Sequence, residues 1–415
     1  MRQLLASVWP LFVGLALCSA SLGLEGSLLP LRAFDEHFDT SDTGIVMSGY
    51  FIGFLVGALI VPELIRRVGH AKVFAAFASI AAASAILHAS FVNIPSWLVL
   101  RIVTGVCIAA LYIVTETWLN DRSSNDTRGK ILNLYVMVNG FSAGIGSLFV
   151  SISNPLSYDP FVLASVLFSI GLVPLLLSSR PAPTYQAARR IGFRRLARKA
   201  PLGVGAITIS SIAFGALVGA GPIYADKAQL TLTEVGTFMA IVYMASLVFM
   251  VPLGHMVDRF DRGRFIGTMS LINAVLAVLL ALTPPDYEIV LYILIAPFSG
   301  ICFAHYGFSL AATNDVLKTE EMVGAGATLF VCASTGMALG PILSTEVIEE
   351  WGPASFFLFL ALVYALLVLY VWSLSSRQRE ATTLRRRAPV PVAPGLQSPR
   401  ATSILLEDEI LTRER

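Results

Sequence analysis

Residues 43–65 read TGIVMSGYFIGFLVGALIVPELI, an apolar run whose only charged side chain is Glu63. A helix of about 20 apolar residues crosses the roughly 30 Å hydrocarbon core of a bilayer. A spanning segment in lipid needs every backbone N–H and C=O paired internally, and this run lacks the short alternating pattern of a membrane barrel. The stretch therefore predicts a transmembrane helix.

The same pattern recurs along the whole chain. Hydrophobic residues make up 56% of the 415 residues, charged residues only 13%, and the mean hydropathy is +0.74. A water-soluble chain carries about twice that charged fraction. We predict an all-α membrane protein with twelve transmembrane helices, at residues 9–31, 43–65, 71–90, 96–118, 131–152, 160–179, 202–224, 233–255, 264–283, 287–311, 323–345 and 354–374.

Lys and Arg distinguish the two sides of the predicted membrane, because cytoplasmic loops retain them. Of the 29 basic residues, 26 fall on one side, Arg32 and Lys227 fall on the other, and Arg101 falls inside a span. We therefore predict that both termini are cytoplasmic, in a multi-pass protein of a bacterial-style inner membrane. The formal net charge of +2 is a small difference between separated charges, so it indicates no nucleic-acid partner.

The spans divide into two sets of six. Residues 1–179 form a predicted N-terminal six-helix bundle and residues 202–374 a C-terminal one, with a basic linker at 180–201. In the linker, Ile191, Phe193 and Leu196 alternate with Arg and Lys, which suits either an amphipathic helix on the cytoplasmic leaflet or a solvated connection. Residues 375–415, rich in Arg and Pro, predict a largely disordered cytoplasmic tail.

The two sets of spans share local features at one offset. A shift of 192 residues places Arg67 on Arg259 and Ser142 on Ser334. Several matches at a single offset indicate a duplication, which predicts two pseudo-symmetric halves related by an axis along the membrane normal.

Four motifs then carry a family resemblance. Residues 254–262, GHMVDRFDR, contain Gly254 followed by Asp258 and Arg259, and residues 101–105, RIVTG, form an R-x-x-x-G motif. Together with ETWLN at 116–120 and ATND at 312–315, these residues make the chain similar to the major facilitator superfamily, in its YcaD-like branch. The resemblance extends over residues 1 to about 375. It implies secondary transport, with a substrate site between the halves.

The resemblance also implies gating residues in the turns between paired helices. In the first half the counterpart motif, PELIRRVGH at 62–70, keeps the later Arg and Gly but has Arg where Asp is usual, so Glu63 or Glu116 would have to supply the carboxylate. Ion pairs in such turns hold the inward gate shut in one state, and the alternative is a solvated charge cluster at the headgroups. The implied gating residues are Arg66, Arg67, Gly69, Glu116, Gly254, Asp258, Arg259 and Arg262.

Two charges inside spans are candidates for proton coupling. Glu25 lies sixteen residues past Trp9, about 24 Å along a helix, and Arg101 lies four residues past Trp97 in a span that runs the other way. Their depths match, so they can pair if the spans are neighbours. A carboxylate that loses its Arg partner in one state would change its proton affinity, whereas a permanent pair would only fix helix register.

Polar and aromatic residues at mid-span are candidates for lining a substrate cavity. For a lone histidine the alternative is a hydrogen-bonded interior group, and for the aromatics it is contact with lipid. The candidates are Tyr112, Asn139, Tyr243, Asn273, His305 and Tyr306.

Enzymatic chemistry is not supported. Residues 140–144, GFSAG, match the G-x-S-x-G elbow, but that motif needs a strand-to-helix turn, and here it lies inside an apolar span. No metal-binding, ATP-binding or dinucleotide motif is present, so we predict no catalytic residue, metal or cofactor.

We therefore expect a secondary transporter that moves a small organic solute by alternating access, coupled to protons, as an antiporter that exports its solute. We expect a monomer whose partners are the solute, protons and the lipid bilayer. The alternatives are a non-transporting membrane sensor or scaffold with the same fold, and a lipid translocase.

Overall fold

The computed structural model describes residues 2–123, 125–177 and 191–378. Within them the secondary structure is helical throughout, and twelve helices are long and apolar enough to cross a membrane, which confirms the predicted number. The tail from residue 379 and the linker at 180–190 lie outside the described residues. The helices are α1 (Arg2–Asp35), α2 (Thr40–Val68), α3 (His70–Ser90), α4 (Ile94–Arg122), α5 (Asn125–Leu148), η1 (Phe149–Ile152), α6 (Asp159–Leu176), α7 (Phe193–Lys199), α8 (Pro201–Lys227), α9 (Leu232–Val257), α10 (Arg262–Leu282), α11 (Glu288–Asn314), α12 (Thr319–Trp351) and α13 (Ala354–Gln378).

Several helices extend beyond the apolar runs that predicted them. The run at 323–345 becomes helix α12, Thr319–Trp351, because an apolar run marks only the hydrocarbon-spanning part while the backbone hydrogen bonds continue into the headgroup region. Breaks are placed by local chemistry. Gly69, between α2 and α3, has φ +90°, a backbone conformation in which a residue with a side chain would be strained.

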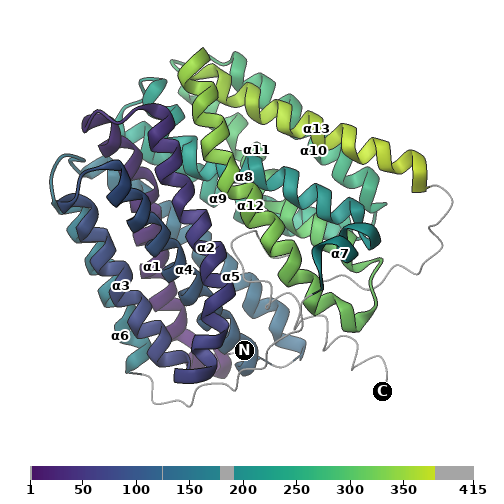
Figure 1. The fold of residues 1–415 in the computed structure, drawn as a ribbon, viewed down its shortest axis with the longest axis horizontal. Helices are drawn as coiled ribbons and strands as arrows, with labels where there is room; N and C mark the ends of the chain where they lie inside the picture. The colour runs from purple at the N-terminus through teal and green to yellow at the C-terminus, as the bar shows by residue number, and fades with distance from the viewer. Residues whose placement is uncertain (1, 124, 178–190, 379–415) are drawn as a thin grey trace.

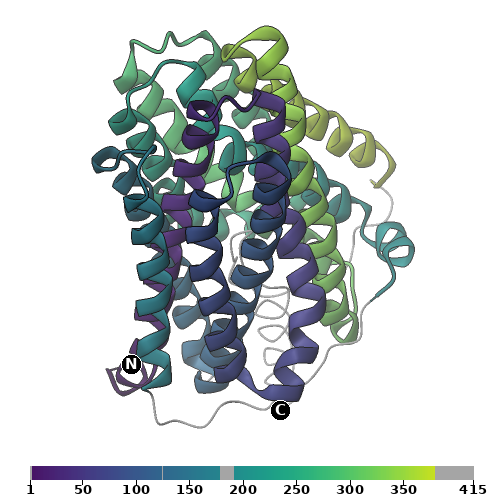
Figure 2. The same ribbon diagram turned by 60° about the vertical axis from the view of Figure 1, so that its left-hand side comes forward.

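Helices α1 to α6 gather on the left of Figure 1 and helices α8 to α13 on the right, and Figure 2 shows the long helices running in one general direction. Within the first group, α1 packs on α5 and α6, and α4 packs on α2 and α3. Within the second group, α8 packs on α11 and α12, and α10 packs on α13. The two groups meet mainly through α2 against α12 and α5 against α9.

Glycines bring α2 and α4 into close contact. A Cβ at Gly53 would collide with the carbonyl of Ile102, and one at Gly105 would collide with the carbonyl of Tyr50. Small residues at such positions let helix backbones approach in membranes, where packing replaces the hydrophobic effect. The glycine of the R-x-x-x-G motif therefore sets how near α2 lies to Arg101.

The contact between α2 and α12 is tightest at one end. The backbone N–H of Ser41, at the start of α2, donates to Glu349 Oε2 of α12 at 2.8 Å. Nearby, Lys227 Nζ lies 4.5 Å from the centre of the Phe34 ring. Figure 1 shows α2 and α12 side by side at this end and spread apart toward the end that carries the chain's N-terminus.

Candidate functional site

A buried ion pair lies where the first group of helices faces the second. Glu25 of α1 and Arg101 of α4 are 1% and 3% exposed, and Arg101 Nη1 lies 3.9 Å from Glu25 Oε2. That distance is too long for a hydrogen bond. Among the described residues, both carboxylate oxygens of Glu25 and Nε and Nη1 of Arg101 have no hydrogen-bond partner. The pair neutralises charge while keeping donors and acceptors free.

Two tyrosines surround this pair. Arg101 Cζ lies 4.9 Å from the ring centre of Tyr50 on α2, a cation–π distance. From the other group of helices, Tyr243 of α9 reaches α1, because a Cβ on Gly26 would lie 3.7 Å from the Tyr243 hydroxyl. The pair therefore has neighbours from both groups.

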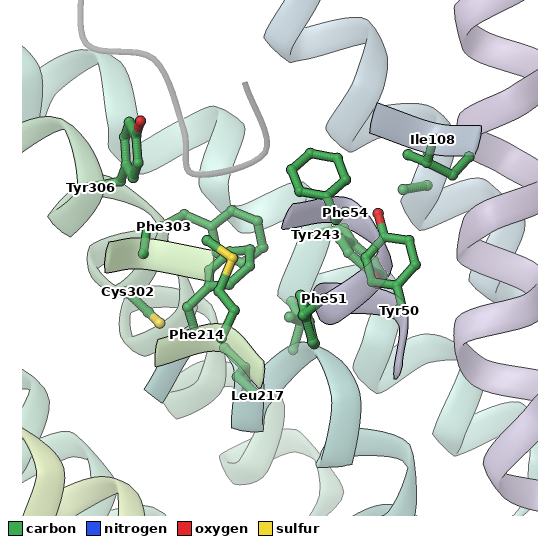
Figure 3. Close-up of a cluster of buried hydrophobic side chains, with 14 of the residues drawn as sticks. Tyr50, Phe51, Phe54, Ile108, Phe214, Leu217, Tyr243, Cys302, Phe303 and Tyr306 are labelled. Carbon is green, nitrogen blue, oxygen red and sulfur yellow. The ribbon is translucent and has the colours of Figure 1, made fainter. Parts of the chain in front are cut away.

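Beyond the tyrosines, aromatic side chains fill the junction between the two groups. Figure 3 shows Phe51 and Phe54 of α2 facing Phe214 and Phe303 of the second group. The rings of Phe214 and Phe303 lie 4.8 Å apart, and Phe54 lies 5.4 Å from Phe330 of α12. This apolar wall gives the charged pair a low-dielectric neighbourhood, in which charge–charge interactions are strong.

The predicted cavity residues separate into two sets. Tyr112 of α4 donates to Asn139 Oδ1 of α5 at 3.0 Å, and Tyr112 packs edge-on against Phe54. These two residues and Tyr243 thus lie close to the ion pair and the aromatic wall. Tyr306, on α11, is 4% exposed, and its hydroxyl has no partner among the described residues.

Asn273 and His305 belong to the packing of the second group instead. Asn273 Nδ2 donates to the Phe298 carbonyl at 3.2 Å. His305 Nε2 lies 3.1 Å from Ser270 Oγ, and its Nδ1 lies 2.8 Å from the Ile301 carbonyl. Both side chains are fully buried between α10 and α11. Both ring nitrogens of His305 thus have partners, as in a hydrogen-bonded interior group, whereas Asn273 Oδ1 has none among the described residues.

The second-half turn forms a compact ion cluster. Arg262, which begins α10, donates to Asp258 Oδ1 at the end of α9 and to Asp315 Oδ2 at the end of α11, each at 2.9 Å. The Arg262 guanidinium also donates to the Val257 carbonyl. One arginine therefore ties three helix ends together. Gly254, within α9, and Arg259, in the turn, flank this cluster.

The first-half turn is built differently. Glu63 Oε1 lies 2.7 Å from both Arg66 Nη2 and Arg67 Nε, so the carboxylate comes from the same helix. Glu116, in contrast, is 1% exposed and accepts a hydrogen bond from Tyr135 at 3.0 Å. The ion-paired residues Glu63, Arg66 and Arg67 therefore all lie in α2, whereas the second-half cluster joins the ends of three helices.

Several residues of these clusters were not among the predicted sites. Asp315 lies in the ATND segment, where its sequence position indicated no role. Tyr50 and Tyr135 lie within predicted spans, where no motif or spacing distinguishes them from other tyrosines. Within the described residues, no group of three or more His, Cys, Asp or Glu side chains forms a metal site.

Comparisons with known proteins agree on the class of protein. The family model described as "Major Facilitator Superfamily" matches residues 11–305 and 204–412. The chain is 27% identical, over 86% of its length and 94% of the relative's, to a protein of Escherichia fergusonii named "Uncharacterized MFS-type transporter YcaD". It is 28% identical, over the same shares, to its namesake from Escherichia coli O7:K1.

Solved structures share the fold. A mutant of the nucleoside transporter NupG superposes with a TM-score of 0.75 at 15% identity, over 88% of this chain and 98% of that one. A bacterial homologue of the human lysosomal transporter Spinster, in an inward-facing and occupied conformation, gives 0.71 at 12% identity, over 92% and 98%. The human organic anion transporter MFSD10 gives 0.62 at 14% identity, over 88% and 98%.

Proposed function

The chain belongs to the major facilitator superfamily and is a multi-pass membrane transporter rather than an enzyme, and from this premise we propose that it moves a small organic solute by proton-coupled alternating access. In this proposal, helices α1–α6 and α8–α13 act as two six-helix halves of a monomer. In the same proposal, both termini lie on the cytoplasmic side of a bacterial inner membrane.

The buried pair of Glu25 and Arg101 is the observation that carries the coupling proposal. An ionisable group inside hydrocarbon costs free energy, so its retention at the junction of the halves indicates a role in transport. Glu25 is the member that can take up and release a proton under physiological conditions, because the arginine guanidinium stays charged. A change in the distance to Arg101 between two conformations would change the proton affinity of Glu25.

The arrangement of contacts between the halves supports alternating access. The halves touch closely where Ser41 meets Glu349, and Figure 1 shows the ribbons of α2 and α12 farther apart at the other end. In this proposal, that other end is the open one. Under the predicted orientation, the open end is cytoplasmic. The Arg262 cluster lies at that end and binds α9, α10 and α11 to one another, so these helix ends would move as one body.

Transport by the purified protein tests this proposal. Proteoliposomes are given a small-molecule extract of bacterial cells, with and without an imposed pH gradient, and the washed vesicles are analysed by mass spectrometry. We expect at least one solute to be carried across the membrane in a gradient-dependent manner and to stop when a protonophore removes the gradient.

A matched pair of carboxylate variants gives the control. Glu25→Gln should lose gradient-driven accumulation but keep solute exchange, while Glu36→Gln should retain both. Glu36 is also paired with an arginine, Arg32, at 2.5 Å, but in the turn after α1. No solute-dependent flux at all would favour a sensor or scaffold, and movement of a fluorescent phospholipid between leaflets would favour a lipid translocase.

A further inference from the structure

The Glu25–Arg101 site holds more unsatisfied hydrogen-bonding capacity than an ion pair needs. Among the described residues, Glu25 has two unpartnered oxygens, Arg101 has unpartnered Nε and Nη1, and the Tyr50 hydroxyl has no partner. All three side chains are at most 3% exposed. Buried polar groups normally have hydrogen-bond partners, so a cluster of polar groups without partners on α1, α2 and α4 indicates a binding site for a polar ligand.

The charges of the cluster determine which guest fits. Arg101 stays positive and offers only donors, whereas Glu25 becomes neutral when it takes a proton. The other titratable groups facing Glu25 are Tyr50 of α2, Tyr243 of α9 and Cys107 of α4, all of which are neutral in their ordinary forms. His88 of α3 interacts with Arg101 and is fully buried, with its Nδ1 2.8 Å from the Ser84 carbonyl, and a second positive charge beside the buried guanidinium would be unfavourable, so we take it as neutral too. Protonation of Glu25 therefore leaves one uncompensated guanidinium in a low-dielectric site. An anion beside Arg101 restores neutrality.

The residues around the pair indicate which kind of chemical group is attached to the negative charge of that anion. Phe51 and Phe54 on one side and Phe214 and Phe303 on the other form the aromatic wall beyond Tyr50 and Tyr243 (Figure 3). The unpartnered Nε–H and Nη1–H groups of Arg101 can donate charge-assisted hydrogen bonds to a carboxylate, and aromatic rings bind apolar groups.

We propose that Arg101 binds the carboxylate of a small organic acid with an apolar or aromatic body, and that this acid enters the site together with a proton carried by Glu25. The inference rests on the proposed transport function and names its substrate class. The charges balance in both states. In the empty state, the Glu25 carboxylate neutralises Arg101, and in the loaded state the proton neutralises Glu25 while the substrate anion neutralises Arg101.

This balance has a consequence for the direction of transport. One proton and one monoanion cross together, so each cycle is electroneutral and runs down the pH gradient. In a cell that is more acidic outside, this drives uptake, and the geometry therefore favours symport over the export expected from the sequence.

Four probes separate the head group from the body. They are 3-phenylpropanoate, its neutral amide 3-phenylpropanamide, the cation 3-phenylpropylamine, and propanoate, which lacks the ring. Each is titrated into the full-length purified protein in detergent, and binding is measured as ligand-induced stabilisation against heating at pH 6 and pH 8. We expect 3-phenylpropanoate to bind at least tenfold more tightly than the other three probes. Its affinity should rise toward pH 6 by up to about tenfold per pH unit, the limit for one linked proton.

Variants of Glu25 and Arg101 show which of the two residues binds 3-phenylpropanoate and which causes the pH dependence of binding. Glu25→Gln resembles the protonated form, so it should bind 3-phenylpropanoate with little pH dependence. Arg101→Gln should weaken binding at least tenfold. Because Arg101→Gln leaves a lone carboxylate, the charge-neutral double variant Glu25→Gln with Arg101→Gln provides a folded form, which should also fail to bind. The matched control Arg32→Gln, which changes an arginine of α1 outside the site, should keep wild-type affinity.

Each alternative result counts against the proposal. No stabilisation by 3-phenylpropanoate, equal stabilisation by the amide or the amine, or full affinity in the double variant would overturn the anion site. Equal binding of propanoate would overturn the aromatic part, and unchanged pH dependence in Glu25→Gln would move the proton elsewhere. Flux is scored separately in the proteoliposomes: carboxylate binding without any flux would overturn the transport proposal alone, and flux of cations or neutral solutes without carboxylate binding would overturn this one alone.

Discussion

A guanidinium and a carboxylate inside a membrane each require compensation, and Glu25 and Arg101 compensate one another in charge but not in hydrogen bonds. A structural ion pair is expected to be closer and bidentate, with its remaining donors bonded. At 3.9 Å the two side chains are near enough for strong attraction in a low-dielectric site and loose enough to admit a third group. This looseness is what we expect of a site that binds and releases a proton or a solute, and it is not expected of an ion pair that only fixes helix register.

Unfolding of single and double variants measures the strength of the pair. Arg101→Gln and Glu25→Gln should each lower the free energy of unfolding by roughly 3–5 kcal/mol, because each leaves a buried charge alone. The double variant should lose much less than the sum, which denaturant unfolding in mixed micelles can measure as a coupling energy. Strictly additive losses would show that the two side chains do not interact. In Glu25→Gln, 3-phenylpropanoate should restore part of the lost stability.

The partners of other single residues show where sequence reasoning ends. Counting residues from Trp9 and Trp97 gave Glu25 and Arg101 similar depths, and the structure places them 3.9 Å apart. Depth does not tell which of several carboxylates an arginine meets. Arg66 bonds to Glu63, three residues earlier on its own helix, where the competition from local pairs is strongest.

The orientation of a polar residue around its helix is equally hidden. Asn273 and His305 are mid-span residues like Tyr112 and Tyr243, so composition grouped them together. The structure places both between α10 and α11, because their side chains find backbone and hydroxyl partners there. Apolar residues on every side of a buried helix leave no periodic signal that would identify its interface face.

Among the helices, the connection at Arg262 invites a direct test. Asp258→Asn and Asp315→Asn should each reduce transport of the solute found in the proteoliposome screen by about tenfold or more, because each removes a charged partner of Arg262 at a turn that must move as a unit. The amount of folded protein in the membrane should change little.

A neighbouring aspartate provides the control for this turn. Asp261 accepts from the Arg264 backbone N–H at 2.9 Å and caps α10. Asparagine caps helices equally well, so Asp261→Asn should transport normally. Normal transport by Asp258→Asn and Asp315→Asn would make the turn a simple connector.

The short helix α7 is attached to α12 by charge, which predicts a pH dependence. Glu321 Oε1 lies 2.6 Å from Lys199 Nζ and 2.7 Å from Arg195 Nη2. The hydrogen bond from Lys199, with help from the Lys318 backbone and the charge of Arg195, lowers the pKa of the Glu321 carboxyl. A lowered folded-state pKa means that this attachment is fully present above the ordinary glutamate value of about 4.3 and is lost as the pH falls further.

Hydrogen exchange at α7 can follow this attachment. After correction for the intrinsic pH effect, exchange of the α7 amides should be slow at pH 7 and should accelerate below about pH 4. Glu321→Gln should make exchange fast at both values, whereas Arg194→Gln, a basic residue of the same helix, should leave the pH profile in place. Equal protection in Glu321→Gln and wild type would show that apolar contacts, such as those of the buried Leu196, hold α7 instead.

Hydropathy predicted the elements well for a physical reason. Water is absent from the hydrocarbon core, so apolar runs of sufficient length have one stable structure, and the described part of the chain has the twelve such helices that were expected. The ends were predicted less well because helices such as α12 continue past the apolar run. The salt link that positions α7 joins residues about 120 apart, and no local pattern reports such a contact.

For the molecule as a whole, the asymmetry of Lys and Arg predicts an orientation that labelling can test. In a variant without native cysteines, single cysteines at Asp39 and Glu350 should react with an impermeant maleimide in intact cells. Cysteines at Arg190 and Ser398 should react only after the membrane is opened. The reverse pattern would overturn the orientation, and a mixed pattern would overturn the division of loops between the two sides.

The contact between Ser41 and Glu349 predicts how the molecule cycles. The Ser41 backbone N–H and hydroxyl both donate to this one carboxylate, joining the start of α2 to the end of α12. If the solute crosses by alternating access, this end must open in each cycle, so the contact must break and re-form. Paired cysteines at Ser41 and Glu349, joined by a short thiol-reactive cross-linker, should hold the end closed.

Cross-linked protein should therefore stop net transport, while the same double variant before cross-linking and each single cysteine variant treated with the reagent should transport. The four native cysteines are buried and must first be replaced, so that the reagent reports only on the new pair. A cleavable linker allows the decisive control, because reduction should restore transport in the same vesicles. If the cross-linked protein transports at the normal rate, α2 and α12 stay together at this end throughout the cycle. In that case the halves do not exchange access by separating there, and the route to that side of the membrane must lie between other helices.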